Sequence, residues 1–298
     1  MIEVLSLGAG VQSSTLYLMA VAGELPRLTE AIFSDTQREP QSVYQWLEYL
    51  KTYGERVPLT VVTRGDLGAD SLIVNKSKKS GKFYQKNLIP FFLKNPDGTD
   101  GFFKRKCTDE YKIREVVKRQ RELVTAPVLR AWRKKHRAAL NEIEAARKDK
   151  RPLPWDAFRE CQSDALTHCW IGISTDEAHR VKPSRQPWVK NTFPLLEKGM
   201  NRGDCLAWLE RNGHPVAPKS SCSFCPYHSD AEWLRLLREE PQEFMAAVAF
   251  EKAVQFAAQK DEVTKGTLWL HRERIPLEKV KFDESDVFSG TCDGYCKT

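Results

Sequence analysis

Short apolar runs alternate with amphipathic segments in the first part of the chain. The runs are four to six residues long, which suits buried strands, and the segments between them carry apolar residues at helical spacing. The expected strands cover residues 2–7, 29–33, 59–63 and 170–173, and the expected helices cover residues 15–22 and 41–53. Strands that alternate with helices in this way predict an α/β protein whose parallel sheet has helices on both faces.

The rest of the chain is expected to be mostly helical. Residues 76–101 are the exception, because their polar, Gly- and Asn-rich composition predicts a mobile loop. Residues 111–150 have a helical pattern, in which Pro127 predicts a break between two helices. Further helices are expected at residues 230–237 and from Pro241 onward, the latter with a core-facing stripe at Phe250, Ala253, Val254 and Ala257.

The composition is that of a globular protein. Of its 298 residues, 41% are hydrophobic and 29% are charged, which excludes a disordered chain and a fibrous repeat. Even the longest apolar runs, such as residues 244–250, are far shorter than the ~20 residues that cross a bilayer. The N-terminus has neither a basic leader nor a small-residue cleavage site. We therefore expect a cytoplasmic protein without a membrane partner.

The net charge of +7 is concentrated in one stretch. Residues 112–151 hold fourteen Lys or Arg against five acids, a local charge of +9. Such a block on a nearly neutral body is typical of a protein with a phosphate-rich partner, although a solvated pair of charged helices fits it equally well. If the partner is nucleic acid, the candidate contacts are Arg130, Arg133, Lys134 and Arg137.

A glycine-rich turn, Gly8-Ala-Gly-Val-Gln-Ser-Ser14, joins the first expected strand to the first helix. Backbone N–H groups at a helix N-terminus bind phosphate; Gly8 and Gly10 would allow its close approach, and Ser13 and Ser14 add hydroxyl donors. The turn has no Lys followed by Ser or Thr and no third glycine, so it is neither the common P-loop nor a dinucleotide fingerprint. A plain tight connection fits it about as well.

Five stretches follow one another in a characteristic order: Ser6-Leu-Gly-Ala-Gly-Val-Gln-Ser-Ser14, Phe33-Ser-Asp-Thr-Gln-Arg-Glu39, Cys107-Thr-Asp-Glu-Tyr-Lys-Ile113, Gly172-Ile-Ser-Thr-Asp-Glu-Ala-His-Arg180, and Phe193-Pro-Leu195 leading to Cys222-Ser-Phe-Cys-Pro226. Together they resemble the adenine nucleotide alpha hydrolase (PP-loop) superfamily, and most closely its phosphoadenosine phosphosulfate (PAPS) reductase-like branch, which includes enzymes of nucleic-acid thiolation and DNA phosphorothioation. The resemblance implies a Rossmann-like α/β core at residues 1–111 and 156–228, interrupted by a basic helical insertion at 112–155 and followed by a Cys-containing helical region at 229–298.

The resemblance also implies site residues. ATP with Mg²⁺, or PAPS or APS, would be bound by Ser6, Gly8, Gly10, Gln12, Ser13 and Ser14, with Asp35 and Asp176 also at the nucleotide. Asp35 and Arg180 would have catalytic roles, unless Asp35 only caps the next helix and Arg180 only forms an ion pair. The usual loop reads Ser-Gly-Gly-x-Asp-Ser, so Gly8 and Gln12 replace its first Ser and its Asp. An amide still hydrogen-bonds phosphate but brings no charge to hold Mg²⁺.

The cysteines suggest a second site. Cys222 and Cys225 have the spacing that lets two thiolates reach one metal, and Cys107 lies in the third stretch. Three thiolates would hold a [4Fe–4S] cluster with one iron open, and the resemblance implies that nucleic-acid thiolases bind the transferred sulfide there. A fourth ligand from Cys292 or Cys296 would make the cluster structural. Zinc suits the same donors, and thiols without a metal are the remaining alternative.

Three functions stay open. The first is ATP-dependent sulfur transfer to DNA or tRNA. The target is adenylated, and a sulfide or persulfide carried on the cluster or on Cys292 or Cys296 then displaces AMP, the sulfur coming from a donor such as a cysteine desulfurase. The second is a PAPS or APS reductase, in which Cys292 or Cys296 attacks the sulfate sulfur and sulfite is released. The third is a non-catalytic nucleotide- or nucleic-acid-binding component of a larger complex. The basic block favours the first, and each allows a homodimer.

Overall fold

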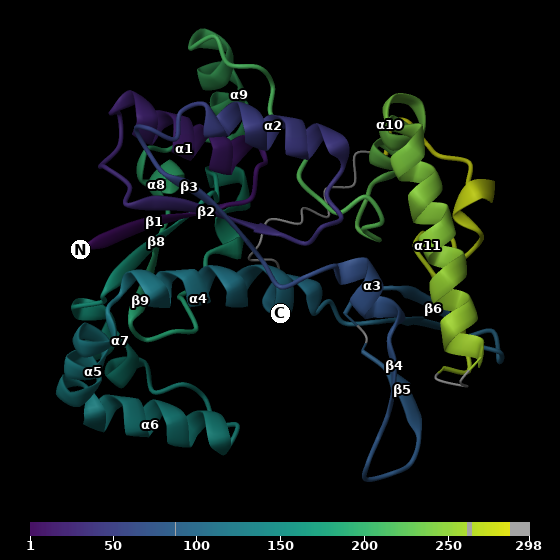
Figure 1. Cartoon of the computed structure of the whole chain (residues 1–298), viewed down its shortest axis with the longest axis horizontal. Coiled ribbons are helices and arrows are strands. Elements are labelled where there is room, and N and C mark those ends of the chain that lie inside the picture. Colours follow the sequence, from purple (N-terminus) through teal and green to yellow (C-terminus); the bar gives the residue numbers. More distant parts are fainter. Residues whose placement is uncertain (87, 261–263, 287–298) are drawn as a thin grey trace. The chain divides into compact units, whose positions relative to one another are not determined.

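The computed structural model describes residues 1–298 except 87, 261–263 and 287–298 (Figure 1). The chain forms two compact units, each assembled from segments that are distant in the sequence. The first unit comprises Met1–Phe33, Glu48–Val62 and Val116–Pro218, and the second comprises Ser34–Leu47, Thr63–Glu115 and Lys219–Thr298. The division into the four segments expected from the sequence stays a prediction.

A five-stranded parallel sheet is the main sheet of the first unit. Its strands are β1 (Ile2–Leu7), β2 (Glu30–Asp35), β3 (Leu59–Thr63), β8 (Thr167–Ile171) and β9 (Val189–Thr192), in the order β3-β2-β1-β8-β9. Helix α1 (Val11–Ala22) lies on one side of the sheet and α4 (Arg114–Leu123) on the other (Figure 1). On the α4 side, Val116 packs with Val4 and Ile32 of the sheet. The predicted α/β protein with helices flanking a parallel sheet is confirmed.

The strand boundaries depend on polar pairs across the sheet. β8 begins three residues before the predicted start at Trp170, because Glu3 of β1 satisfies its polar side chains. The Nδ1 atom of His168 lies 2.9 Å from Glu3 Oε1, and the Trp170 indole N–H donates to Glu3 Oε2 at 2.7 Å. β9 was not predicted, because Lys190 and Asn191 interrupt its short apolar pattern.

Three helices, not two, follow one another in the basic stretch. After α4 come α5 (Ala126–Lys135) and α6 (Arg137–Lys148), and then α7 (Trp155–Ser163). The break at Pro127 is confirmed, since this residue lies in the first turn of α5. The break between α5 and α6, at His136, could not be predicted because no Gly or Pro marks it. There the buried imidazole Nε2 lies 2.7 Å from Asp164 Oδ1, a contact that holds the junction of the two helices.

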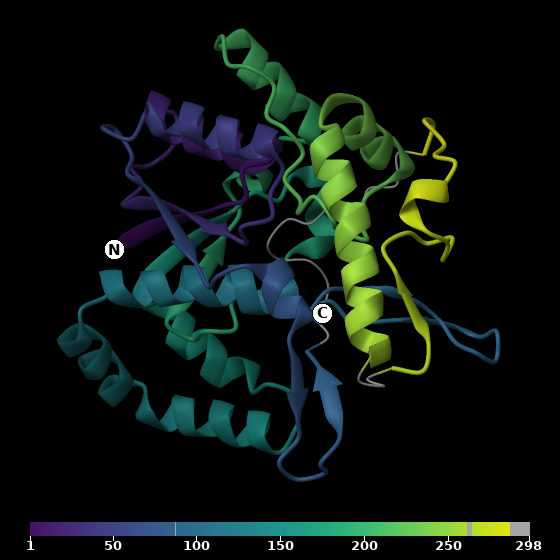
Figure 2. The same cartoon turned by 45° about the vertical axis from the view of Figure 1, so that its right-hand side comes forward.

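The expectation of a loop over residues 76–101 is wrong, because this stretch contains short strands. β4 (Val74–Lys76) and β5 (Phe83–Gln85) form a hairpin, and β10 (Thr267–Trp269), β6 (Phe92–Lys94) and β7 (Asp100–Phe102) form an antiparallel sheet in that order (Figure 2). Gly81 and Gly98 provide the turns at φ values of 68° and 84°. Between the hairpins, Leu88 and Phe91 are buried. The sequence did not predict these strands, because their few buried apolar residues are surrounded by polar ones.

The second unit is completed by α3 (Leu67–Leu72), α10 (Asp230–Glu239) and α11 (Pro241–Lys260). Both C-terminal helices are therefore confirmed. In α11 the stripe is buried at Phe250 and Val254, whereas Ala253 and Ala257 are half-buried at its border. The remaining helical elements are α2 (Gln41–Lys51), α8 (Pro194–Glu197), α9 (Arg202–Arg211), a π-helical turn (Thr108–Ile113) and 3₁₀ turns at Thr175–Arg180 and Leu277–Lys279. Among the described helices, none is long and apolar enough to span a membrane.

Candidate functional site

The glycine-rich turn of the first unit closes tightly at the start of α1. The Gly8 N–H donates to Ser13 Oγ at 3.1 Å, and the Ser13 hydroxyl donates to the Gly10 carbonyl at 3.3 Å. Between them, Ala9 has a φ of 59°, a left-handed conformation that costs a side-chain-bearing residue about 1 kcal/mol. Strained residues of this kind gather at ligand sites. The first turn of α1 carries no acidic residue, so nothing within it neutralises the positive end of the helix dipole.

The fourth stretch of the resemblance packs directly against this turn. Gly172 lies so close that an added β-carbon would stand 2.8 Å from the Ser13 nitrogen. Beyond it, the Gln12 side-chain NH₂ lies 3.4 Å from Ser174 Oγ and 3.3 Å from Glu177 Oε2. Two stretches more than 150 residues apart in the sequence therefore form one polar cluster in the first unit.

Two arginines belong to the same cluster. Arg202, the first residue of α9, donates through Nη1 to Gln12 Oε1 at 2.9 Å, and its backbone N–H donates to Asp176 Oδ1 at 3.2 Å. Arg180 is 7% exposed and donates to Glu177 Oε1 at 2.6 Å. The Gln12 amide thus bridges a carboxylate and a guanidinium. Two guanidinium groups beside a helix N-terminus are the groups that recognise phosphate.

A Gly172→Ala substitution should test the packing of these two stretches. The new methyl group would meet the backbone of Ser13, which cannot rotate away, so we expect a loss of about 1–3 kcal/mol in the free energy of unfolding, together with weaker nucleotide binding. The matched control is Gly8→Ala, whose β-carbon would lie 3.6 Å from Ser13 Oγ, an ordinary contact. Equal stability of the two variants in urea titrations would contradict the packing argument.

Asp35 is the last residue of β2 and belongs to the second unit. Its Oδ1 accepts hydrogen bonds from the Gln37 N–H at 2.7 Å and from the Tyr44 hydroxyl at 2.9 Å. Burial, followed by the Asp35 charge, raises the pKa of Tyr44, so this phenol stays a proton donor. Through these two hydrogen bonds, both accepted by Oδ1, Asp35 orders the turn that leads to α2.

The other three stretches of the resemblance meet in the second unit. Glu39 and Lys112 form a buried ion pair at 3.1 Å, and the Ser34 hydroxyl donates to the Tyr111 carbonyl at 2.5 Å. The Cys222 sulfur lies 3.2 Å from Thr36 Oγ1 and 3.9 Å from Glu39 Oε1. The second and third stretches are thus joined to each other and to the Cys222 end of the fifth through polar side chains, just as the first and fourth are joined in the first unit.

Cys222 and Cys225 occupy one buried turn. The Cys225 N–H donates to the Cys222 carbonyl at 2.9 Å, and Cys222 and Cys225 are 6% and 7% exposed, respectively. Below the turn, His228 Nε2–H donates to the Cys222 carbonyl at 3.0 Å. Burial lowers the pKa of His228 to about 3, so the ring is neutral at physiological pH. The turn is therefore fixed in place by backbone and imidazole contacts.

Cys107 packs against the apolar cluster that contains Cys222 and Cys225. Three thiols in one apolar environment are a donor set suited to iron–sulfur or zinc. In the part of the chain that the structure describes, no group of three or more His, Cys, Asp or Glu side chains is already arranged around a metal position. Cys292 and Cys296, the other candidate ligands or nucleophiles, lie outside the described residues.

The remaining cysteines are buried core residues. Cys161, Cys169 and Cys205 have no solvent exposure. Burial raises the pKa of both Cys161 and Cys205 to about 11, which keeps these thiols protonated and poorly nucleophilic.

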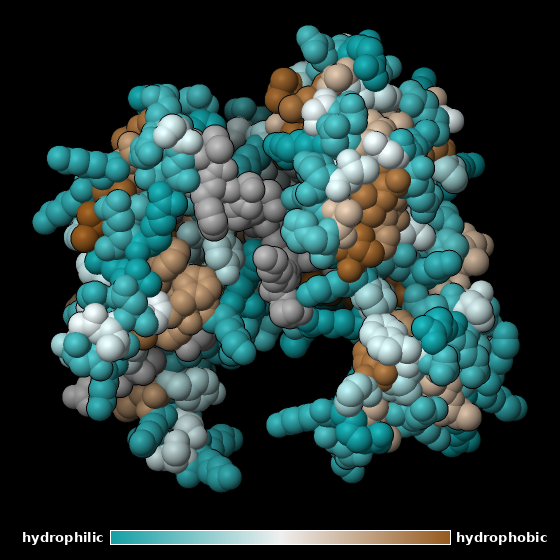
Figure 3. Space-filling view, turned by 180° about the vertical axis from the view of Figure 1, so that it is seen from behind, coloured by the Kyte–Doolittle hydropathy of each residue, from teal (hydrophilic) through white to brown (hydrophobic). Residues whose placement is uncertain are grey.

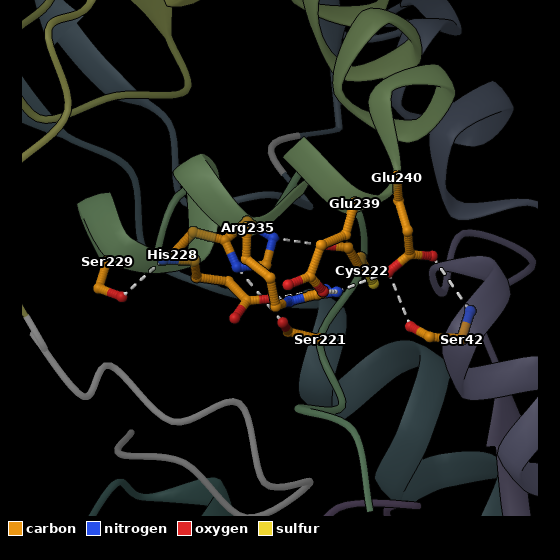
Figure 4. Close-up of polar contacts among 9 residues, drawn as sticks. Ser42, Ser221, Cys222, His228, Ser229, Arg235, Glu239 and Glu240 are labelled. Carbon is orange, nitrogen blue, oxygen red and sulfur yellow. Dashed lines mark hydrogen bonds and ion pairs between the residues drawn. The ribbon is translucent and has the colours of Figure 1, made fainter. Parts of the chain in front are cut away.

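An ionic cluster ties α10 to the start of α2 within the second unit (Figure 4). Arg235 pairs with Glu232 at 2.9 Å and with Glu240 at 2.8 Å. Glu240 in turn accepts hydrogen bonds from the Ser42 hydroxyl and from its backbone N–H, at 2.8 and 3.1 Å. These bonds hold the start of α2, which follows Asp35, against the end of α10, which follows the Cys222–Cys225 turn. They therefore help to position both Asp35 and the cysteine pair.

The basic candidates lie on the surface of the first unit. Arg130, Arg133 and Lys134 belong to α5, Arg137 begins α6, and all four are exposed. Arg133, Lys134 and Arg137 line one groove, which Arg130 does not reach.

Sequence reasoning missed Arg202, which lies outside every recognisable stretch. No family model, curated protein or solved structure matches the chain.

Proposed function

We propose that this protein is a PP-loop enzyme that uses ATP to transfer sulfur to nucleic acid. One observation carries the proposal: the first and fourth stretches contact each other in the first unit, and the second and third contact each other and the Cys222 end of the fifth in the second unit. Unrelated matches scattered over more than 200 residues would have no reason to pack together. In addition, the first unit combines the phosphate-type turn with the basic helices.

In the proposed reaction, an oxygen of the target attacks the α-phosphorus of ATP. The bond between the α-phosphorus and the bridging oxygen breaks, pyrophosphate leaves, and the target is adenylated. A sulfide then displaces AMP, so that sulfur replaces oxygen without net oxidation. The N–H groups at the start of α1, with Arg180 and Arg202, would offset the charge of the phosphates.

The chain has residues that suit both Mg²⁺ and an iron–sulfur cluster. Asp176 and Glu177 are the carboxylates beside Gln12, and their oxygens suit Mg²⁺ that arrives with the nucleotide phosphates. Cys107, Cys222 and Cys225 would hold an iron–sulfur cluster, or zinc in its place. When bound, a cluster with an open iron would supply a place for sulfide.

Turnover assays test the function directly. Anaerobically purified protein is mixed with ATP, Mg²⁺, labelled sulfide and either DNA or tRNA. We expect pyrophosphate release that depends on the nucleic acid, and label that stays in the nucleic acid after digestion to nucleotides. Sulfite release from PAPS or APS without any nucleic acid would instead identify a reductase. Nucleotide binding with neither product would identify a non-catalytic component.

Charge reversal of Arg130, Arg133, Lys134 and Arg137 to Glu separates the first two functions. Wild-type binding of nucleic acid should weaken steeply with salt, with a log–log slope of about −0.9 per phosphate neutralised on duplex DNA. The variant should bind much more weakly and with a flatter slope, while its ATP affinity stays unchanged. A variant with the wild-type slope in fluorescence anisotropy would show that the basic helices are only a solvated surface.

A further inference from the structure

A groove of about 720 Å³ opens on the first unit between α5, α6 and residues 186–188. Its lining includes the cations Arg133, Lys134, Arg137 and Arg147 and the indoles of Trp132 and Trp188. From behind, the surface over these helices is mostly hydrophilic, with hydrophobic side chains set among the polar ones (Figure 3). The groove therefore combines two kinds of surface in one concave site.

The cations of the groove are not neutralised by the protein. Within the described residues, Arg133, Lys134 and Arg137 form no ion pair, and Glu144 is the one acidic residue of the lining. Their neighbour Lys135 behaves differently, since it pairs with Asp164. Positive charges that are not paired within the protein and that line one groove favour the binding of an anionic ligand.

The apolar part of the lining is the floor of the groove, where side chains that belong largely to the core reach its surface. Trp132 and Trp188 are 5% and 4% exposed, and the Trp132 indole N–H donates to the Asp164 carbonyl at 3.1 Å. Arg147 bonds the Arg185 carbonyl and thereby ties α6 to the segment before Trp188. Because these residues are held by packing and hydrogen bonds, the floor does not have to form when a ligand arrives.

A double helix could contact the cations of this groove but not its apolar part. It presents phosphates outward and keeps the flat faces of its bases stacked inside, where an apolar floor cannot reach them. An unpaired strand presents phosphates and base faces together, and proteins bind it by joining cations with apolar or aromatic platforms. The side-chain amides of Asn141 and Gln186 add donors and acceptors for base edges.

We propose that this groove binds unpaired nucleotides of the target strand, with phosphates on Arg133, Lys134 and Arg137 and bases toward the apolar floor. The inference rests on the proposed function, because it names the form in which the nucleic acid is bound. It also separates the basic residues: Arg130 shares α5 with Arg133 but lies outside the groove.

The test compares Arg133→Gln and Arg137→Gln with the matched control Arg130→Gln in the full chain. Anisotropy titrations use a 20-nucleotide single strand, a hairpin duplex and a strand of equal charge that lacks bases, each as DNA and as RNA. We expect the single strand to bind at least about tenfold more tightly than the duplex and about fivefold more tightly than the baseless strand. Each groove variant should lose about tenfold, with a salt slope smaller by ~0.7 per lost contact, and Arg130→Gln should stay within about twofold.

The outcomes distinguish the two proposals. Duplex binding as tight as single-strand binding, equal affinity for the baseless strand, or equal losses in Arg130→Gln and Arg133→Gln would overturn the groove while leaving a nucleic-acid target in place. Wild-type protein that binds none of the probes at low salt would overturn the nucleic-acid target and the groove together. Circular dichroism and ATP titration of each variant report whether it is folded.

Discussion

A Gly10→Val protein should fold like the wild type and bind ATP at least about 100-fold more weakly. Gly10 precedes α1 with φ −94° and ψ 178°, an extended backbone that valine adopts without strain. Its carbonyl still accepts the Ser14 N–H at 3.0 Å, so the start of the helix should survive. The isopropyl group, however, would stand at the mouth of the turn, where phosphate oxygens must approach the backbone donors.

The expected size follows from the bonds that would be lost. A hundredfold weaker affinity is about 2.7 kcal/mol, which matches the loss of one or two hydrogen bonds to a charged phosphate. Calorimetric titration with ATP and with PAPS measures the effect, and Gly10→Ala should give an intermediate value because its side chain is smaller. Wild-type ATP affinity in a Gly10→Val protein with a normal unfolding transition would exclude the turn as the phosphate site.

The core of the fold could be predicted because local pattern and final environment agree. The strand Ile2–Leu7 is mostly apolar, and its buried residues Val4, Leu5 and Leu7 lie in the middle of a parallel sheet. The strand pairs of the second unit could not be predicted in the same way. β6 pairs with β10, which lies more than 150 residues later in the sequence. The alternation of apolar and polar residues in a strand of three residues is too short to predict such a partner.

The site was predictable only in part for a related reason. The glycine turn and the Cys222–Cys225 pair are visible as spacing, but their surroundings depend on tertiary packing. Arg202 reaches Gln12 because α9 begins there, and the only local signal is the capping box of Asn201 and Asp204, which marks a helix start rather than a ligand. The departure at Gln12 also gains a physical account: a carboxylate at this position would face Glu177, and an amide does not repel it.

Loss of the proposed metal should be the clearest effect of any change at Cys107, Cys222 or Cys225. We expect anaerobically purified wild-type protein to carry iron and sulfide with the broad visible absorption of an iron–sulfur cluster. Each single Ser variant should lose most of that iron, since a hydroxyl is a poor ligand for iron and the other described thiols, Cys161, Cys169 and Cys205, belong to the first unit. Serine is chosen over alanine because Cys222 and Cys225 are buried, and a smaller side chain would leave a cavity.

The control is Cys161→Ser or Cys205→Ser, each of which alters a fully buried thiol in the first unit. These variants should retain the wild-type iron content even if they unfold more easily, because neither thiol belongs to the apolar cluster that holds Cys107, Cys222 and Cys225. Iron and zinc are counted by elemental analysis together with the absorption spectrum. One zinc per chain in place of iron would turn the cysteine site into a structural one. Full iron content in Cys222→Ser would show that the metal is held elsewhere, and sulfur delivery would then have to be assigned to other thiols.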